Sequence, residues 1–477
     1  MEQREEGEPR CLRLLNGIVS FTGVENVQSA SDWMKTGRVD LSDWVIHFVH
    51  ARRMEDFPDP FSWAAPASSI QDGDVSDEEA QRIDDQCQSE NAGHVPCSFD
   101  VSGPQYSDLD CYDDEYPWEP DAYPMTVLTK IVKDGYLRAG WSFRKSKATI
   151  YGPQPAVCFT EMPLYALLDY AKKRSYSGLV DTYAIVLRRE ELFQAGGRPV
   201  IYGLTGEPQD AQAGDPEYGM GYRALKSACL PLREQYRYVT TGIGGDRSVD
   251  WTHEREWRWV DLEGACDPPG LAIWLKEPKT RFSEILILVK TASESKNIRD
   301  TLKYLYDSEF NHLALELDRE KLLATSVLAI ENVADDILKN PVLRVEDLPV
   351  EKMTSIQPIE ADEETIALVR QALASAEQAG RAAAQAYRLD HWPNKKVVDT
   401  CGYAYVRTYE SHSKVTAALL KIGCADPLVE SGGYELHGLK FGIEDQSMQI
   451  EEAAAREAAR LLTEGLGQKF FMWSRMD

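Results

Sequence analysis

The stretch "DWTHEREWRWV" at residues 250–260 places two glutamates two positions apart among aromatic and arginine side chains. This composition is typical of a β-strand, in which alternate side chains share a face, so we expect Glu254, Glu256 and Arg258 on one side. Two neighbouring carboxylates raise each other's pKa and can act as a general base or stabilise a developing cation. The pattern leaves open a surface ladder in which arginines neutralise both carboxylates.

Other reactive residues of the sequence predict less chemistry. His253 directly precedes Glu254, but adjacent residues of a strand point to opposite faces and no HxxxH pattern is present, so no metal site is predicted. Cys158 in "AVCFTE" has no basic neighbour, which favours an inert buried thiol over a nucleophile. The nine cysteines include no CxxC pair, so neither a disulfide framework nor a zinc ribbon is indicated.

The elements that must position the two glutamates are short strands broken by brief helices. Between residues 125 and 290 this pattern predicts a mixed α+β unit and not a regular βαβ series. Strands are expected in "DWVIHFVHARR", "AVCFTE", "TYAIVL", "GRPVIYG", "QYRYVTTGI" and "FSEILILVK", the last of them central because it is continuously apolar. No GxGxxG or GxxxxGK[ST] element occurs, so a dinucleotide would not bind in the Rossmann or P-loop manner.

The length of 477 residues suggests two or three domains. We predict a first domain at 1–290, a helical connector at 291–345 and a small C-terminal α+β domain at 363–477 that acts as a sensor or binds a partner. The first domain contains an acidic insertion at about 55–122, with 19 acidic residues and one basic residue, too polar to fold by itself. The aromatic end at 470–476 is interpreted as a docking edge rather than a platform for stacked bases.

The net charge of −26 disfavours broad attachment to phosphate backbones or anionic lipids, although a local basic cleft stays possible. The first residues lack a basic segment followed by an apolar core, and no run approaches the roughly 18 apolar residues of a membrane helix. The sequence therefore predicts a cytoplasmic protein without a membrane partner.

The order of the motif blocks "VIHFVHARR", "VCFTEMPLYAL" and "THEREWRW" resembles the AbiGi-like abortive-infection proteins of bacteria, whose hallmark strings are "HFT", "VCFTE.PL" and "HEREWR". The blocks are also similar, more distantly, to the DarT and CmdT class of ADP-ribosyltransferase toxins. The closer resemblance covers residues 40–290 and implies an ADP-ribosyltransferase-like mixed sheet with flanking helices.

The resemblance implies NAD as a substrate and no metal. Breaking the nicotinamide–ribose bond passes through an oxocarbenium-like cation, which a carboxylate beside that carbon stabilises. Glu256 takes this role in the resemblance, and Glu254 would steer or deprotonate the acceptor. The other expected contacts to NAD are the ribose-binding His47, the stacking residues Phe159 and Tyr202, and their neighbours Phe48, Thr160 and Arg258.

The implied function is that of an antiviral abortive-infection toxin, which transfers ADP-ribose from NAD to a nucleic-acid or protein acceptor. A phage-derived trigger or an antitoxin protein would then be its partner. The alternative is a catalytically inactive binding module that senses a phage component or restrains a partner toxin; Val49 favours it, because the family has threonine at that position. A nuclease is disfavoured because no Asp and His cluster has usable metal-ligand spacing.

Overall fold

The computed structural model describes residues 42–50, 123–140, 143–144, 147–175, 182–204, 210–211, 222–226, 230–241, 250–262, 270–340, 343–353, 359–391, 400–429, 431–443 and 447–476. The expected acidic insertion at 55–122 and the start of the chain lie outside these ranges.

An eight-stranded sheet forms the centre of the first part of the chain, in the order β14-β13-β12-β6-β1-β5-β10-β7. Of its neighbouring pairs, β12 and β13 are parallel and the others antiparallel. The expected mixed α+β architecture with a large mixed sheet is therefore confirmed. The strands are β1 (Trp44–Val49), β5 (Val157–Thr160), β6 (Tyr183–Arg188), β7 (Arg198–Pro199), β10 (Glu256–Trp259), β12 (Ile285–Val289), β13 (Thr325–Ala329) and β14 (Glu351–Lys352).

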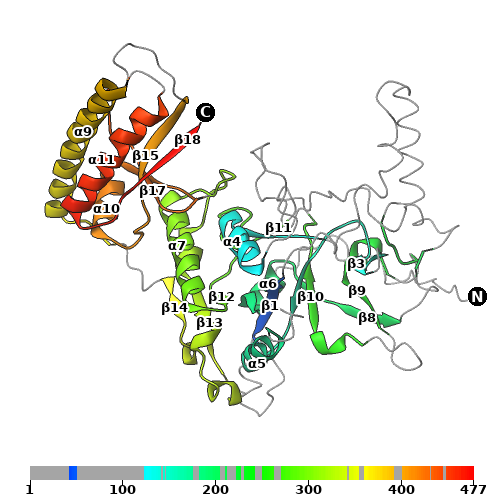
Figure 1. The fold of residues 1–477 in the computed structure, drawn as a ribbon. Coiled ribbons are helices and arrows are strands. Elements are labelled where there is room, and N and C mark those ends of the chain that lie inside the picture. The colour runs from blue at the N-terminus through cyan, green and yellow to red at the C-terminus, as the bar shows by residue number, and fades with distance from the viewer. Residues whose placement is uncertain are drawn as a thin grey trace, which may run out of the picture.

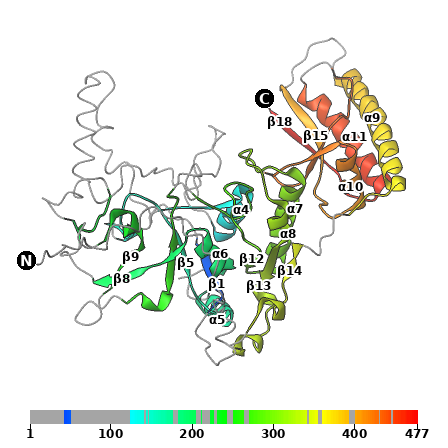
Figure 2. The same ribbon diagram turned by 180° about the vertical axis from the view of Figure 1, so that it is seen from behind.

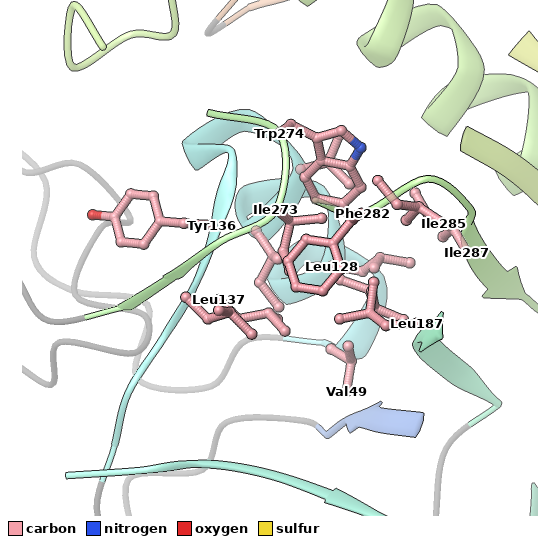
Figure 3. Close-up of a cluster of buried hydrophobic side chains, with 14 of the residues drawn as sticks. Val49, Leu128, Tyr136, Leu137, Leu187, Ile273, Trp274, Phe282, Ile285 and Ile287 are labelled. Carbon is pink, nitrogen blue, oxygen red and sulfur yellow. The ribbon is translucent and has the colours of Figure 1, made fainter. Parts of the chain in front are cut away.

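Helices cover both faces of this sheet, because its central strands carry apolar side chains in both directions. On one face, α4 (Pro124–Asp134), α6 (Arg189–Gln194) and α7 (Ala292–Ser308) contribute to a core with Val45 and Val49 of β1. Figure 3 shows Val49 of β1 and Leu128 of α4 in this core. On the other face, α5 (Leu164–Ser175) packs against Trp44 and Ile46. All five residues of β12 are buried, as predicted for a central strand.

Smaller elements surround the main sheet (Figure 1). A parallel pair, β8 (Ile201–Leu204) and β9 (Tyr238–Thr241), forms a separate two-stranded sheet, so the expected strand in "GRPVIYG" is divided between β7 and β8. The remaining elements of this part are β2 (Tyr136–Arg138), β3 (Phe143–Arg144), β4 (Lys147–Ala148), β11 (Gly270–Ala272), α8 (Arg319–Leu323), and the 3-10 turns η2 (Leu232–Arg237), η3 (Thr252–Glu254), η4 (Ile330–Asn332), η5 (Ile337–Lys339) and η6 (Val345–Asp347).

The prediction of a helical connector at 291–345 is wrong. Only α7 and the short α8 are α-helical there, and β13 pairs with β12 in the main sheet. The run "TSVLA" is short and apolar, a composition that fits a buried strand as well as a helix, and pairing with β12 decides between them. The adjoining β14, which lies between the predicted connector and the predicted C-terminal domain, also joins this sheet.

The C-terminal unit is a second, smaller α+β structure. Its strands form one antiparallel sheet in the order β16-β17-β15-β18, and from β15 onward the chain follows the βαββαβ topology of ferredoxin-like folds. Figures 1 and 2 show α9 and α11 on one side of this sheet. The elements are α9 (Glu363–His391), β15 (Gly402–Thr408), α10 (Lys414–Lys421), β16 (Ala425–Pro427), β17 (Tyr434–Leu436), α11 (Met448–Leu466) and β18 (Phe471–Met476).

The two units meet at α7. Ile298 and Leu302 of this helix lie in the core of the main sheet, whereas Tyr304 lies in the core of the C-terminal unit. Conversely, Val429 of the C-terminal unit packs in the core of the main sheet. The hydroxyl of Tyr434 donates a hydrogen bond of 2.7 Å to Asp307 at the end of α7. The helix therefore belongs to the packing of both units.

Candidate functional site

The two motif blocks "VCFTE" and "HEREWR" lie side by side, because β5 and β10 are antiparallel neighbours. Glu256 is opposite Thr160, and Arg258 is opposite Cys158. The hydroxyl of Thr160 also donates a hydrogen bond to the carbonyl of Glu254, 94 residues away in the sequence. Tertiary pairing thus brings four of the residues selected from the sequence to one end of two neighbouring strands.

The strand begins at Glu256 and not before it, which corrects the expected geometry of the glutamate pair. Glu254 ends the 3-10 turn η3, and Arg255 adopts the left-handed conformation with φ 48°. A left-handed residue interrupts the alternation of side chains along a strand. The shared strand face predicted for Glu254, Glu256 and Arg258 therefore applies only to Glu256 and Arg258.

Glu256 and Arg258 form an ion pair at the edge of the core. The Nε of Arg258 donates to Oε1 of Glu256 at 2.7 Å, and its Nη1 donates to the carbonyl of Tyr236 at 2.6 Å. The side chain of Arg258 is 5% exposed and that of Glu256 is 14% exposed. Arg258 is thus a buried support, whereas the carboxylate of Glu256 reaches the surface in a fixed orientation.

Tyr202 connects this pair to the small β8–β9 sheet. Its hydroxyl oxygen accepts the backbone N–H of Glu256 at 2.9 Å. Burial raises the pKa of Tyr202, and the backbone hydrogen bond opposes that rise. Arg258 contacts the same sheet because its guanidinium lies near the carbonyl of Tyr238, the first residue of β9. The β8–β9 sheet therefore borders the carboxylate of Glu256.

His47 and Phe159, expected to bind NAD with Glu256, lie on the opposite face of the main sheet. Ile46 and Glu256 are both opposite Thr160 in register, so His47 is one residue out of phase with Glu256 and projects the other way. The ring of His47 instead contacts Phe159 edge-on, with centroids 5.7 Å apart. Phe159 is 2% exposed and belongs to the core of that face.

The surroundings of His47 favour an uncharged ring. Burial lowers its pKa to about 4, and the Cys158 carbonyl 2.9 Å from Nδ1 opposes this only in part. A carbonyl accepts hydrogen bonds and cannot donate them, so Nδ1 carries the proton of the neutral ring. His47 is therefore a core-facing histidine with a satisfied donor, the structural role that a lone strand histidine usually has.

Phe48 lies on the same face as Glu256 but packs against α5. Its ring centroid is 5.7 Å from that of Tyr170. Tyr170 also lines an open hollow of about 440 Å³ on the surface of α5. The hollow is lined by Met162, Tyr165, Ala166, Asp169, Tyr170 and Lys173. Phe48 thus contacts a residue that lines this hollow. None of the described contacts joins Phe48 to Glu256.

Glu161, which follows β5, was not among the residues selected from the sequence. Its carboxylate is 7% exposed and accepts hydrogen bonds from Arg189 and Arg255, both at 2.8 Å, and from the indole of Trp257 at 3.0 Å. Its backbone N–H donates to the carbonyl of Arg255. Glu161 therefore holds the turn before β10 in place. The sequence signal for this role was a glutamate at the end of the block "CFTE", which could pair with the arginines of the block "HEREWR".

Cys158 lies beside the ion pair but is a poor nucleophile. Burial, together with the neighbouring Glu256, raises the pKa of this thiol to about 12, so the reactive thiolate is rare near neutral pH. Among the described residues, no group of three His, Cys, Asp or Glu side chains is arranged to hold a metal ion. None of the described helices is both long and apolar enough to cross a membrane.

Comparison with known proteins gives no relative: no family model, no curated protein and no solved structure matches the chain.

Proposed function

We propose that this chain is an NAD-dependent transferase of the cytoplasm, an antiviral abortive-infection toxin that moves ADP-ribose from NAD to a nucleic-acid or protein acceptor. One observation carries the proposal. Glu256 is a partly exposed carboxylate that a buried arginine holds in one orientation, at the junction of the two motif blocks. A carboxylate fixed in advance can stabilise a developing ribosyl cation without reorganising during the reaction.

The roles of the other residues follow from the side of the sheet on which they lie. Arg258 is a positioning residue, because it acts through Glu256 and is itself buried. Tyr202 and Thr160 surround the start of β10, and we propose that they contact the nicotinamide riboside part of NAD. Glu254 is next to them in the turn, where we propose that it approaches the acceptor. His47 and Phe159 are left out of this revised set, because they face the opposite core.

The test is release of nicotinamide from NAD by the full chain, measured by mass spectrometry, with toxicity in bacterial cells as a second readout. Glu256→Gln removes the charge and almost no volume, and we expect it to lower nicotinamide release on the order of 100-fold or more. Asp210→Asn is the matched control. Asp210 is a partly buried carboxylate paired with Arg223, and its side chain is 16% exposed, close to the 14% of Glu256. The control should release nicotinamide at the rate of the parent chain.

The inactive binding module remains the second candidate, and the separation of His47 from Glu256 by the sheet favours it. A module of this kind needs no carboxylate that faces NAD. Calorimetric titration with NAD separates the two proposals, because the transferase must bind NAD whereas the module need not. An absence of both heat and nicotinamide release would overturn the transferase proposal. Equal release by the parent chain and Glu256→Gln would remove Glu256 from the mechanism.

A further inference from the structure

The sheet of the C-terminal unit has one face packed under helices. Its other face carries aromatic and arginine side chains on β15 and β18, and the carboxylates of Glu435 and Asp426 on β17 and β16. Ala404 and Val406 of β15 point into the helical core. The alternate residues Tyr403, Tyr405 and Arg407 therefore project from the other face. They are opposite Arg475, Trp473 and Phe471 of β18, in that order.

Three of these rings form a row across the two strands. The centroids of Tyr403 and Tyr405 are 6.5 Å apart with an interplanar angle of 34°, and those of Tyr405 and Trp473 are 6.1 Å apart with an angle of 33°. The guanidinium of Arg407 lies 3.7 Å from the centre of the Trp473 ring. Arg407 is fixed in turn by an ion pair of 2.8 Å with Glu435. The row is therefore a supported, roughly aligned set of flat surfaces.

The charge of this unit differs from that of the whole chain. Residues 363–477 contain 16 acidic and 13 basic residues, a net charge of −3, whereas the whole chain carries −26. On the aromatic face, Arg475 is exposed, and within the described ranges no carboxylate forms an ion pair with it. The negative charge of the whole chain therefore disfavours a nucleic-acid partner less strongly at this surface.

We propose that this face, made of Tyr403, Tyr405, Arg407, Trp473 and Arg475, binds a single-stranded nucleic acid. Unpaired bases stack on flat aromatic side chains of an open four-stranded sheet, and an exposed arginine next to them can neutralise a phosphate. The six outward side chains of β15 and β18 are all aromatic or arginine: Tyr403, Tyr405, Arg407, Phe471, Trp473 and Arg475. The ligand is therefore recognised mainly by stacking, which tolerates different base sequences.

The position of the face in the fold is compatible with a long ligand. The opposite edge strand, β16, contacts α7 and so lies toward the first unit. The aromatic row is on the β15–β18 side, and β18 is the free edge of the described sheet. Residues 470–476, expected from the sequence to be a docking edge, instead form part of a platform for bases in this proposal, because the partner strand β15 adds two further rings. This inference concerns the C-terminal unit alone and does not rest on the transferase proposal.

The experiment is fluorescence anisotropy of the full chain with labelled single strands of RNA and of DNA, about 12 nucleotides long, and with the corresponding duplex. We expect the single strands to bind more tightly than the duplex. Trp473→Ala should weaken binding of single strands about 10- to 100-fold, and Trp473→Phe should restore most of it, because a flat ring remains. Tyr123→Ala is the control, since Tyr123 is an aromatic residue 79% exposed on the first unit.

A second variant keeps the test informative if Trp473→Ala fails to fold. Arg475→Gln changes only an exposed side chain, and it should weaken binding and reduce the salt dependence by about one phosphate contact. Arg388→Gln, on the exposed surface of α9, should leave both unchanged. No binding of single strands by the parent chain, or binding that Trp473→Ala and Arg475→Gln leave unchanged, would overturn the proposal. A dimer in sedimentation that Trp473→Ala dissociates, without nucleic-acid binding, would show that the face pairs with a second copy instead.

Discussion

Replacement of Arg258 by methionine tests whether the ion pair at the candidate site is a buried structural support. The substitution keeps much of the side-chain volume but removes the cation from Glu256 and the donor from the carbonyl of Tyr236. Loss of one partner from a buried pair costs about 3–5 kcal/mol, because the other charge loses its compensation. The exposure of 5% for Arg258 and 14% for Glu256 supports this range rather than the value below about 1 kcal/mol that is typical of surface pairs.

The assay is native-state hydrogen exchange followed by mass spectrometry, in which peptides from β5 and β10 report the free energy of opening of this part of the sheet. We expect Arg258→Met to lower that free energy by about 3–5 kcal/mol, while peptides from β15 in the C-terminal unit remain unchanged. The double variant Glu256→Gln with Arg258→Met should recover roughly 1–3 kcal/mol, since no uncompensated charge is left.

A loss below about 1 kcal/mol in Arg258→Met would refute this reasoning, because the pair would then behave as a solvated surface contact. So would a double variant no more stable than Arg258→Met, because the cost would then come from packing and not from the charge of Glu256.

Two further predictions concern the pKa values of His47 and Cys158, which are both partly buried. The pKa of folded His47 is about 4, below its ordinary value of 6.5, so the unfolded chain binds a proton that the folded chain excludes, and the free energy of unfolding should fall by up to about 1.4 kcal/mol per pH unit as pH decreases through that window. His47→Gln should remove this part of the pH dependence in urea unfolding, and an unchanged pH profile would contradict the assignment. Cys158, with its pKa raised to about 12, should react with iodoacetamide on the order of 1000-fold more slowly than an ordinary thiol near pH 8. Peptide mass spectrometry would compare it with the exposed Cys401, and equal rates for the two thiols would disprove its protection.

Local patterns in the sequence determined most of the regular elements. The helix at 363–391 follows from its alanine-rich composition, and the strands at 183–188 and 285–289 follow from short apolar runs. Gly135, a residue type that commonly ends helices, adopts φ 82° at the end of α4. These features depend on residues close together in the chain, so the sequence alone could specify them.

Tertiary structure decided where the strand of the candidate site begins and which side chains share its face. The composition of "THEREWR" suggests a continuous strand, but hydrogen bonds from Thr160 and Glu161 fasten a turn in which Arg255 is left-handed. Tertiary structure also sets the register of the strands. Because Ile46 and Glu256 are both opposite Thr160, His47 projects from the face of the sheet opposite to that of Glu256. A shift of one residue reverses a strand face, and no pattern within one segment fixes its register against segments about a hundred residues away.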